Sequence, residues 1–270
     1  MRKSSGKKLG KPTLSPTKIG TYLVCRLMYK YTYIDKIGRL YYRPKAYHSF
    51  GASLHRTLEQ FHEAGGVQTQ SPDDLVHKLH EVWTPLGYAS AAEENEHIEI
   101  AERLLADYYA SSYAEEGVRT LFTEKPLKCS MGEFDLMGRL DRLDEHSDGS
   151  LEVVDYKSGR ITVTEEDVRN DLGMSIYAYL VHRVFPDREI RGTIHALRSG
   201  ERATVLFSEE DLQEIEGHIA AIAADILRTD EDSYIEPVWL PNVCPRCDYL
   251  RLCARTMQWD VPALIAQCGS

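Results

Sequence analysis

The sequence predicts an α/β fold in which helices flank a mixed β-sheet. Three runs between positions 118 and 157 have strand-like composition: 120–125, 133–143 and 151–157. Asp148-Gly149 separates the last two runs and is typical of a tight hairpin turn. Helical periodicity precedes this block, and two further strands are expected after it, at 192–197 and 203–207. This order of elements favours a mixed sheet with helices on its faces.

Capping residues and apolar spacing predict the helices. Ser15 suits the N-cap of a helix, and Pro16 suits its first position. Apolar residues then recur at helical spacing after position 51, at Leu54, Leu58 and Phe61. Thr164 and Asp167 form a near capping box that opens one long helix over 164–185. Further helices are expected over 72–83, 92–114 and 208–227, the last beginning with acids that suit a helix dipole.

The composition excludes several classes of protein. The chain has 270 residues, of which 43% are hydrophobic and 27% are charged, so it is not disordered, collagen-like or a coiled coil. No apolar run approaches the ~20 residues of a membrane span. Polar residues follow the basic N-terminus, where a signal peptide would be apolar. A cytoplasmic, reducing location is therefore expected, in which six cysteines do not form a disulfide framework.

The charge is unevenly distributed along the chain. Residues 1–56 carry 13 Lys and Arg against one acid, whereas the remainder carries 19 against 41. A basic segment of this kind favours contact with a polyanion such as nucleic acid. Residues 1–13 are also consistent with a merely solvated flexible arm. Beyond them, tyrosines interleave with the cations, which suits single-stranded nucleic acid, and the candidate DNA-binding residues are Arg26, Lys30, Arg39 and Arg43.

The densest chemistry lies in G-R-L-D-R-L-D at 138–144 and L-E-V-V-D-Y-K-S-G at 151–159. Residues two apart on a strand share a face, so Asp155 and Lys157 project together. Asp141, on the paired strand, can bring its carboxylate to that of Asp155. Two adjacent acids repel unless a cation lies between them, and their oxygens suit Mg²⁺ or Mn²⁺. A D-x-K motif alone is equally consistent with a surface ion pair.

These motifs resemble the RecB-like branch of the PD-(D/E)XK nuclease superfamily. The resemblance implies a restriction-endonuclease-like sheet core and extends to Gly51-Ala-Ser-Leu-His55, a G-x-x-x-H context on an upstream helix. It implies that Lys157 is the catalytic lysine and that Glu124 has a supporting role. The implied ligands of Mg²⁺ or Mn²⁺ are His55, Asp141, Asp155 and the carbonyl of Tyr156. The spacing of His55, Glu59 and His62 also fits a separate helical metal site.

One position departs from the family pattern. Members commonly carry Q-x-x-x-Y on the helix after the lysine strand. Here Tyr177 matches and is assigned to the catalytic set, but Gly173 stands where Gln is expected. The missing Gln affects substrate positioning and removes no metal ligand.

Three cysteines lie close together near the end of the chain, as Cys244, Cys247 and Cys253 in a C-x₂-C-x₅-C motif. Three thiolates at this spacing predict a metal centre, which needs a fourth ligand. The residues alone leave that ligand open among Cys25, Cys129, Cys268 and nearby histidines. They also leave open a zinc site or an iron–sulfur cluster, because both accept four cysteines.

A second resemblance concerns these cysteines. In iron–sulfur RecB-like nucleases, an N-terminal Cys in a context like S-x-x-x-(I/L)-x-x-Y-x-x-C joins a C-terminal C-x₂-C-x₅-C. The matching residues here are Ser15, Ile19, Tyr22 and Cys25. The nuclease subunit of AddAB helicase–nucleases and CRISPR-associated adaptation nucleases share this arrangement. The resemblance therefore implies a [4Fe–4S] cluster that staples the two ends of the chain, with Cys129 and Cys268 as ordinary thiols.

Together these observations predict a single nuclease domain over 14–270, with a helical insertion at 65–116 and a cluster segment at 237–260. The expected activity is metal-dependent hydrolysis of DNA, by an exonuclease acting on single strands or DNA ends. Helicase, repair or CRISPR proteins are the expected partners. The alternatives are a non-catalytic iron–sulfur DNA-binding module and a zinc-stapled scaffold whose acidic C-terminal helix binds a protein.

Overall fold

The computed structural model describes residues 10–112, 117–159 and 162–267. Most of the predicted N-terminal arm (1–9), the end of the predicted helix 92–114 and Cys268 lie outside these ranges. Thr13, the last residue of that arm, already belongs to a strand. Within the described ranges no helix has the length and apolar character needed to cross a membrane.

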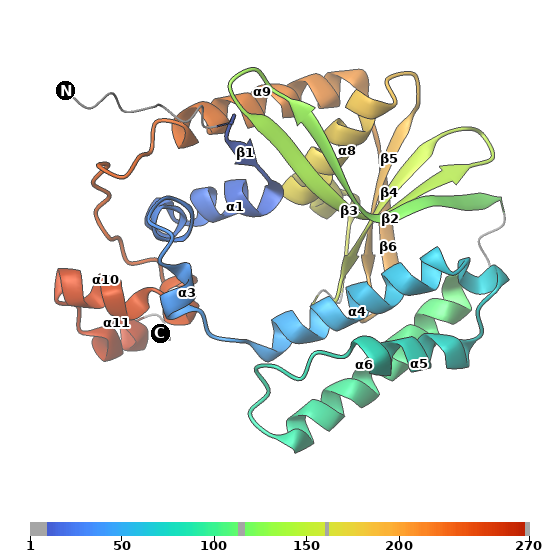
Figure 1. The fold of residues 1–270 in the computed structure, drawn as a ribbon, viewed down its shortest axis with the longest axis horizontal. Coiled ribbons are helices and arrows are strands. Elements are labelled where there is room, and N and C mark those ends of the chain that lie inside the picture. Colours follow the sequence, from blue (N-terminus) through green and yellow to red (C-terminus); the bar gives the residue numbers. More distant parts are fainter. Residues whose placement is uncertain (1–9, 113–116, 160–161, 268–270) are drawn as a thin grey trace, which may run out of the picture.

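A six-stranded mixed sheet forms the centre of the molecule (Figure 1). β3 pairs antiparallel with both β2 and β4, β4 pairs parallel with β5, and β5 pairs antiparallel with β6. The short β1 runs parallel to the start of β3. The strands are β1 (Thr13–Leu14), β2 (Val118–Ser130), β3 (Asp135–His146), β4 (Leu151–Lys157), β5 (Ile190–Ala196) and β6 (Glu201–Phe207). The predicted mixed sheet is confirmed, and β4 has the predicted bounds.

Helices cover both faces of this sheet. On one face, α1 (Pro16–Val24), α8 (Leu172–Val184) and α9 (Glu209–Ile226) contribute to the larger apolar core. On the other, α4 (Ala46–Glu63), α5 (Pro72–Val82) and α6 (Ala91–Ser112) bury a second core against Val154 and Tyr156 of β4. Alternate residues of β4 therefore face different cores, as a pleated strand requires. The predicted caps are present, since Ser15 accepts a hydrogen bond from the Lys18 N–H.

The predicted helix over 164–185 is wrong, because the chain forms two helices there. α7 (Glu165–Asn170) has the predicted capping box, in which Thr164 and Asp167 exchange hydrogen bonds. Asp171 then has extended backbone angles, φ −76° and ψ 113°, and its side chain caps α8. Asp is a favoured N-cap, because its carboxylate stabilises the first turn of a helix. At Asp171 this preference outweighs the continuation of α7, so a new helix begins.

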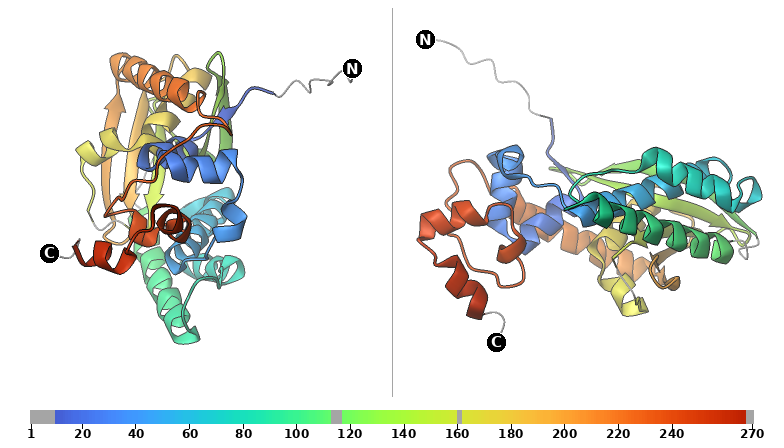
Figure 2. Two further views of the ribbon diagram at one scale, coloured as in Figure 1. Left: turned by 90° about the vertical axis from the view of Figure 1, so that its left-hand side faces the viewer. Right: turned by 90° about the horizontal axis from the view of Figure 1, so that it is seen from below.

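The segment that follows α1 meets the C-terminal segment away from the sheet. The N-terminal segment continues through α2 (Arg26–Tyr29), η1 (Lys30–Ile34) and α3 (Gly38–Tyr41), and the C-terminal segment through η3 (Cys244–Arg246), α10 (Leu250–Met257) and α11 (Val261–Gln267). These segments lie side by side (Figures 1 and 2). The hydroxyls of Thr32 and Tyr249 are 2.8 Å apart, and Lys45 Nζ lies 3.3 Å from Asp248 Oδ1.

Candidate active site

Three side chains from three elements gather at one end of the sheet. His55 of α4, Glu124 of β2 and Asp141 of β3 bring one ligand atom each to within 4.8 Å of one another. Among the described residues, this is the only such group of three histidine, cysteine or acidic side chains. Carboxylate oxygens suit hard divalent cations, and imidazole is a common partner in metal sites. The donor set therefore fits a divalent metal.

Asp141 occupies the centre of this group. Its Oδ1 lies 3.1 Å from His55 Nδ1, and its Oδ2 accepts a hydrogen bond of 2.8 Å from the backbone N–H of Tyr156. The second bond comes from the neighbouring strand, which pairs with β3 at Arg142 and Val154. The sheet itself thus fixes the direction of the Asp141 carboxylate.

Gly51 lets α4 come close enough to place His55. A Cβ at this position would lie 3.0 Å from the Ser158 hydroxyl oxygen, just beyond the end of β4. Gly51 precedes His55 by about one helical turn, so the two share a helix face. This contact explains physically why the G-x-x-x-H spacing accompanies the site.

Glu124 stands opposite Asp141 in the antiparallel pair of β2 and β3, where Thr123 faces Arg142 and Lys125 faces Leu140. Its φ is +44°, a left-handed value that a non-glycine residue adopts only at a cost. The carboxylate lies 2.7 Å from Arg139 Nε. Burial and the charge of Asp141 raise the Glu124 pKa. This combination of strain and like charge is typical of a functional site.

The predicted lysine lies between two carboxylates. Lys157 Nζ is 2.8 Å from Asp155 Oδ2 and 3.1 Å from Asp171 Oδ2. Burial lowers the Lys157 pKa, but the two carboxylates outweigh it and raise the pKa overall. Asp155 is 6% exposed, and burial together with the Asp141 charge raises its pKa to about 6. Asp155 lies next to the group of His55, Glu124 and Asp141 but does not belong to it.

The charge of His55 follows from the acids around it. Burial lowers the pKa of its imidazole, whereas the hydrogen bond to Asp141 and the charges of Asp141, Asp155 and Glu124 raise it. The net result is a pKa of about 9. These acids favour a positive charge at this point, which either a proton on the ring or a bound metal cation can supply.

A cleft of about 1080 Å³ opens onto His55, Glu124 and Asp141. Tyr177 lines it from α8, and its ring packs over Gly138 of β3, where a Cβ would lie 2.9 Å from the ring. Burial and the charges of the surrounding acids raise the Tyr177 pKa, so its hydroxyl stays protonated and can donate. Tyr47 and His48 add two further rings to the lining, and their ring centroids are 4.2 Å apart.

The side chain of Tyr156 lies on the opposite face of β4 from Asp155, where its ring centroid is 6.0 Å from that of His55. Its hydroxyl accepts a 2.9 Å hydrogen bond from Arg142 and lies 2.9 Å from the Tyr108 hydroxyl. His62 joins the same buried network, since its Nε2 is 2.8 Å from Arg142. His62 therefore lies away from His55 and Asp141, and the described metal group contains neither His62 nor Glu59.

The four cysteines of the predicted cluster line one cavity. Cys25 begins α2, and Cys244, Cys247 and Cys253 approach it from the C-terminal segment. Two of the sulfurs already accept backbone hydrogen bonds, Cys25 from the Met28 N–H and Cys244 from the Leu240 N–H. Burial and the neighbouring cysteines raise the Cys253 pKa to about 11. Cys129 lies elsewhere, on β2.

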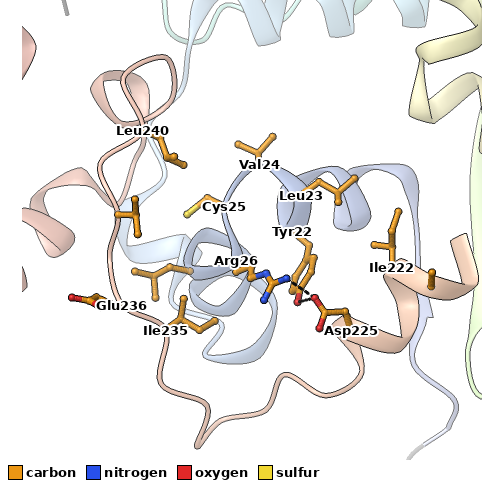
Figure 3. A pocket seen from close by; sticks show the side chains of 13 residues that line it. Tyr22, Leu23, Val24, Cys25, Arg26, Ile222, Asp225, Ile235, Glu236 and Leu240 are labelled. Carbon is orange, nitrogen blue, oxygen red and sulfur yellow. Dashed lines mark hydrogen bonds and ion pairs between the residues drawn. The ribbon is translucent and has the colours of Figure 1, made fainter. Parts of the chain in front are cut away.

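The predicted DNA-binding cations differ in their surroundings. Arg26 is paired with Asp225 at 2.7 Å beside the Tyr22 hydroxyl (Figure 3). Lys30 is buried, and its ammonium lies 2.6 Å from Asp35 and donates to the Glu231 carbonyl at 3.0 Å. A contact between Lys30 and DNA would require it to leave both partners. Arg39 and Arg43 are exposed.

Sequence reasoning missed one residue next to the site. Asp171 was hidden inside a predicted helix, and the signal that could have found it is its own preference for the N-cap position. Glu124, for which a supporting role is expected, lies in the group of three that could hold a metal. Its position opposite Asp141 depends on a register shift between Thr120 and Phe122, which no sequence pattern indicated.

The fold and site define a class: α/β proteins in which a helix brings a histidine next to the carboxylates and the lysine of a mixed sheet. Within that class, the chain belongs to the PD-(D/E)XK nuclease superfamily, whose family model matches residues 13–254. Proteins of this superfamily use divalent metals, and both family membership and the site support a nuclease function.

Relatives and a solved structure agree with this membership. The chain is 26% identical over 161 residues to one subunit of the ATP-dependent helicase/deoxyribonuclease of Lactococcus lactis subsp. lactis (strain IL1403), covering 54% of this chain and 15% of that protein. It is 29% identical over 103 residues to the same subunit from L. lactis subsp. cremoris (strain SK11), covering 34% and 9%. The chain thus spans a small part of these relatives. A structure from Eubacterium rectale, provisionally assigned as an exonuclease, has the same fold, with a TM-score of 0.50, 15% identity and coverage of 93% of both chains.

Proposed function

We propose that this chain is a metal-dependent deoxyribonuclease that acts as an exonuclease on single-stranded DNA or DNA ends. One observation carries the proposal: His55, Asp141 and Glu124 form a group that could hold a metal ion, and the paired strands β3 and β4 place the Asp155–Lys157 pair beside Asp141. Lone acids or a lone D-x-K pair would fit many solvated surfaces. Their convergence with the half-buried imidazole of His55 and with Glu124, whose φ is left-handed, fits catalysis on a phosphodiester.

Each residue has a distinct role in this proposal. The residues that would hold Mg²⁺ or Mn²⁺ are His55, Asp141, Asp155 and the Tyr156 carbonyl, with Glu124 beside them. When bound, the metal would supply Lewis acidity at the scissile phosphate and lower the pKa of water. Lys157 orients the attacking water and balances charge that develops on the phosphoryl oxygens. Tyr177 donates a hydrogen bond from the wall of the cleft.

A basic groove next to the active-site cleft supports a path for the DNA strand. This groove, of about 910 Å³, is lined by cations from both ends of the chain: Lys36, Arg39, Lys45 and Arg246. Tyr42 adds an exposed ring, 63% accessible. Lys45 immediately precedes α4, whose first turn carries Tyr47 and His48 into the cleft. Cations beside stacking surfaces suit a single strand, and exposed Arg43 continues this surface.

The cysteine cavity supports a [4Fe–4S] cluster as the group that joins the chain ends. Four thiols from distant segments line it, and burial together with the neighbouring thiols keeps the Cys253 pKa high, so ionised ligands there need a cationic partner. A tetrahedral zinc ion accepts the same four thiolates, so the two groups are distinguished by metal and sulfide analysis.

The relatives supply the candidate biological setting. Both named relatives are helicase/deoxyribonuclease subunits, which supports a helicase as a partner of this chain. Repair, recombination and CRISPR adaptation all require trimming of DNA ends. A nuclease of this architecture would supply that step.

A cleavage assay tests the proposal. Protein purified without oxygen is incubated with end-labelled single-stranded DNA and Mn²⁺ or Mg²⁺, beside Asp155→Ala, Lys157→Ala and the exposed control Asp232→Ala. We expect metal-dependent shortening from one end by the wild type and Asp232→Ala, and none by the other two variants. Protein that retains its cluster and binds DNA without cutting it would support the non-catalytic module instead.

Metal analysis tests the cysteine site separately. Iron and labile sulfide in equal amounts, about four of each per chain, would support the cluster. One zinc ion without sulfide would contradict it and favour the zinc-stapled scaffold.

A further inference from the structure

Asp171 does two things at once at the start of α8. Its Oδ1 accepts a hydrogen bond of 2.9 Å from the Met174 N–H, which caps the helix. Its Oδ2 lies 3.1 Å from Lys157 Nζ. The capping bond fixes the side-chain conformation, so the second oxygen is held at the lysine by the helix itself. An exposed ion pair between two long side chains would have no such support.

The glycine two residues later makes room for this carboxylate. A Cβ at Gly173 would lie 3.0 Å from Asp171 Oδ1, the oxygen that caps the helix. Contacts this short require the neighbour to shift, and a shift of Oδ1 would weaken the bond to Met174. Glycine is otherwise unfavourable in a helix. Its presence is explained by the carboxylate that it accommodates.

We propose that Asp171 is the positioning residue for Lys157, and that Gly173 provides the space that Asp171 needs to hold this position. The inference rests on the proposed nuclease function. An ammonium group has three donors. Asp155 and Asp171 direct two of them and thereby fix the direction of the third. A flexible four-carbon side chain is thus ordered before DNA arrives, which lowers the entropic cost of reaching the reactive geometry.

Sharing the lysine between two acids also preserves charge at Asp155. A lysine paired with Asp155 alone would neutralise that carboxylate and reduce its attraction for a cation. With Asp171 present, the three groups carry a net charge of about −1 when both acids are ionised. Asp155 can therefore attract a cation while it helps to hold Lys157.

Paired substitutions separate positioning from helix capping. Ser is as good an N-cap as Asp, but it is too short to reach Lys157, so Asp171→Ser keeps the cap and loses the ion pair. Asp171→Asn keeps the size and removes the charge. We expect kcat on end-labelled single-stranded DNA to fall by about 10- to 100-fold in both variants, with KM nearly unchanged. Thr164→Ala removes the cap of α7 instead and should keep the wild-type kcat.

Gly173→Gln tests the second half of the inference. If Gly173 only marks a lost residue, restoring Gln should leave kcat unchanged or raise it. If Gly173 makes room for Asp171, Gln at this position should lower kcat about as much as Asp171→Ser does. Equal melting temperatures of the variants, within a few degrees, exclude general unfolding as the cause.

A readout independent of cleavage separates this inference from the proposed function. In metal-free protein, a Lys157 ammonium held by two carboxylates should give a distinct ¹H–¹⁵N resonance. This resonance should persist in Thr164→Ala and be lost in Asp171→Ser. Inactive wild-type protein would overturn the nuclease proposal, and the resonance would still decide whether Asp171 holds Lys157. Wild-type kcat and an unchanged resonance in Asp171→Ser would overturn the inference alone.

Discussion

The sheet site and the cysteine cavity both gather candidate metal ligands, but the protein builds them differently. At the sheet, the residues on either side of Asp141 and of Asp155 along their strands are buried. Each of the two carboxylates already has a protein partner. The cysteine segment has little packing of its own. No residue of η3, α10 or α11 is buried, and Tyr249 is the one described residue between 244 and 267 that is.

This difference indicates two sources of order in one chain. The acidic site is preorganised by sheet pairing and by a core on each face of the sheet, so it can exist before a metal binds. The cysteine segment buries too little apolar surface to stay packed on the N-terminal segment by itself. A group bound by its sulfurs would supply the missing stability. The two regions are therefore expected to lose structure separately.

The largest effect is expected from Asp141→Ala. This substitution removes the acceptor of both the His55 imidazole and the Tyr156 N–H, and with it the centre of the metal-binding group. Cleavage of end-labelled DNA should fall by at least about 100-fold. The iron content of the proposed cluster should not change, because the cysteines lie elsewhere. Glu145→Gln, on the same strand, is the matched control and should retain wild-type cleavage. A loss of iron in Asp141→Ala would show that the two regions are coupled.

Removal of one cysteine should produce the opposite pattern. If the proposed group orders the segment over 237–260, this segment should become at least about ten-fold more sensitive to protease in Cys247→Ser. The thermal unfolding of the sheet core should shift far less. Mass spectrometry of the first fragments locates the cleavage. If the whole domain unfolds in one step instead, the separation of the two regions is wrong.

The pH dependence of stability tests the buried network beneath α4–α6. His195 of β5 joins this network, since its ring stacks on that of Tyr108. Burial and the nearby Arg142 charge lower the His195 pKa to about 4, and the His62 pKa is lowered for the same reasons. Above the unfolded pKa of about 6.5, His195 is neutral in both states. As the pH falls from about 6.5 to about 4, the unfolded chain binds a proton that the folded chain does not. The free energy of unfolding should drop by up to about 3 kcal/mol through His195, and His62 should change it in the same direction.

Urea unfolding at several pH values measures this dependence. His195→Gln should reduce the slope between about pH 4 and 6.5. Protease sensitivity of the cysteine segment should not follow the same titration, because that segment lies outside the network. An unchanged slope in His195→Gln would mean that this histidine has the same proton affinity in both states.

Much of the site could be predicted because strands fix their residues locally. The period of a strand places Asp155 and Lys157 on one face, and a hairpin brings Asp141 to the next strand, without knowledge of the rest of the fold. The resemblance supplied His55, whose position depends on the close approach of α4 at Gly51. Distant contacts of this kind leave no periodic signal in a single sequence.

The errors arose where a local preference competed with a tertiary one. Residues 164–185 have continuous helical character, yet the cap at Asp171 breaks the helix and turns a carboxylate towards Lys157. Glu124 adopts a left-handed φ that no strand propensity predicts. Both exceptions lie at the site, where a protein tolerates local cost for function.

The smallest effects separate two kinds of cation in the basic N-terminal region. Lys30→Met removes the partner of Asp35 and of the Glu231 carbonyl, so the free energy of unfolding should fall by about 1–3 kcal/mol. Arg39→Ala changes an exposed residue and should alter stability by less than about 0.5 kcal/mol.

DNA binding should show the reverse order. Arg39→Ala should weaken binding and reduce the slope of log K against log salt concentration by about 1, because one phosphate contact is lost. Lys30→Met, measured where it is fully folded, should keep the wild-type slope, since its ammonium is engaged inside the protein. If Lys30→Met reduces the slope as Arg39→Ala does, Lys30 leaves Asp35 to contact DNA, and this ion pair opens on binding.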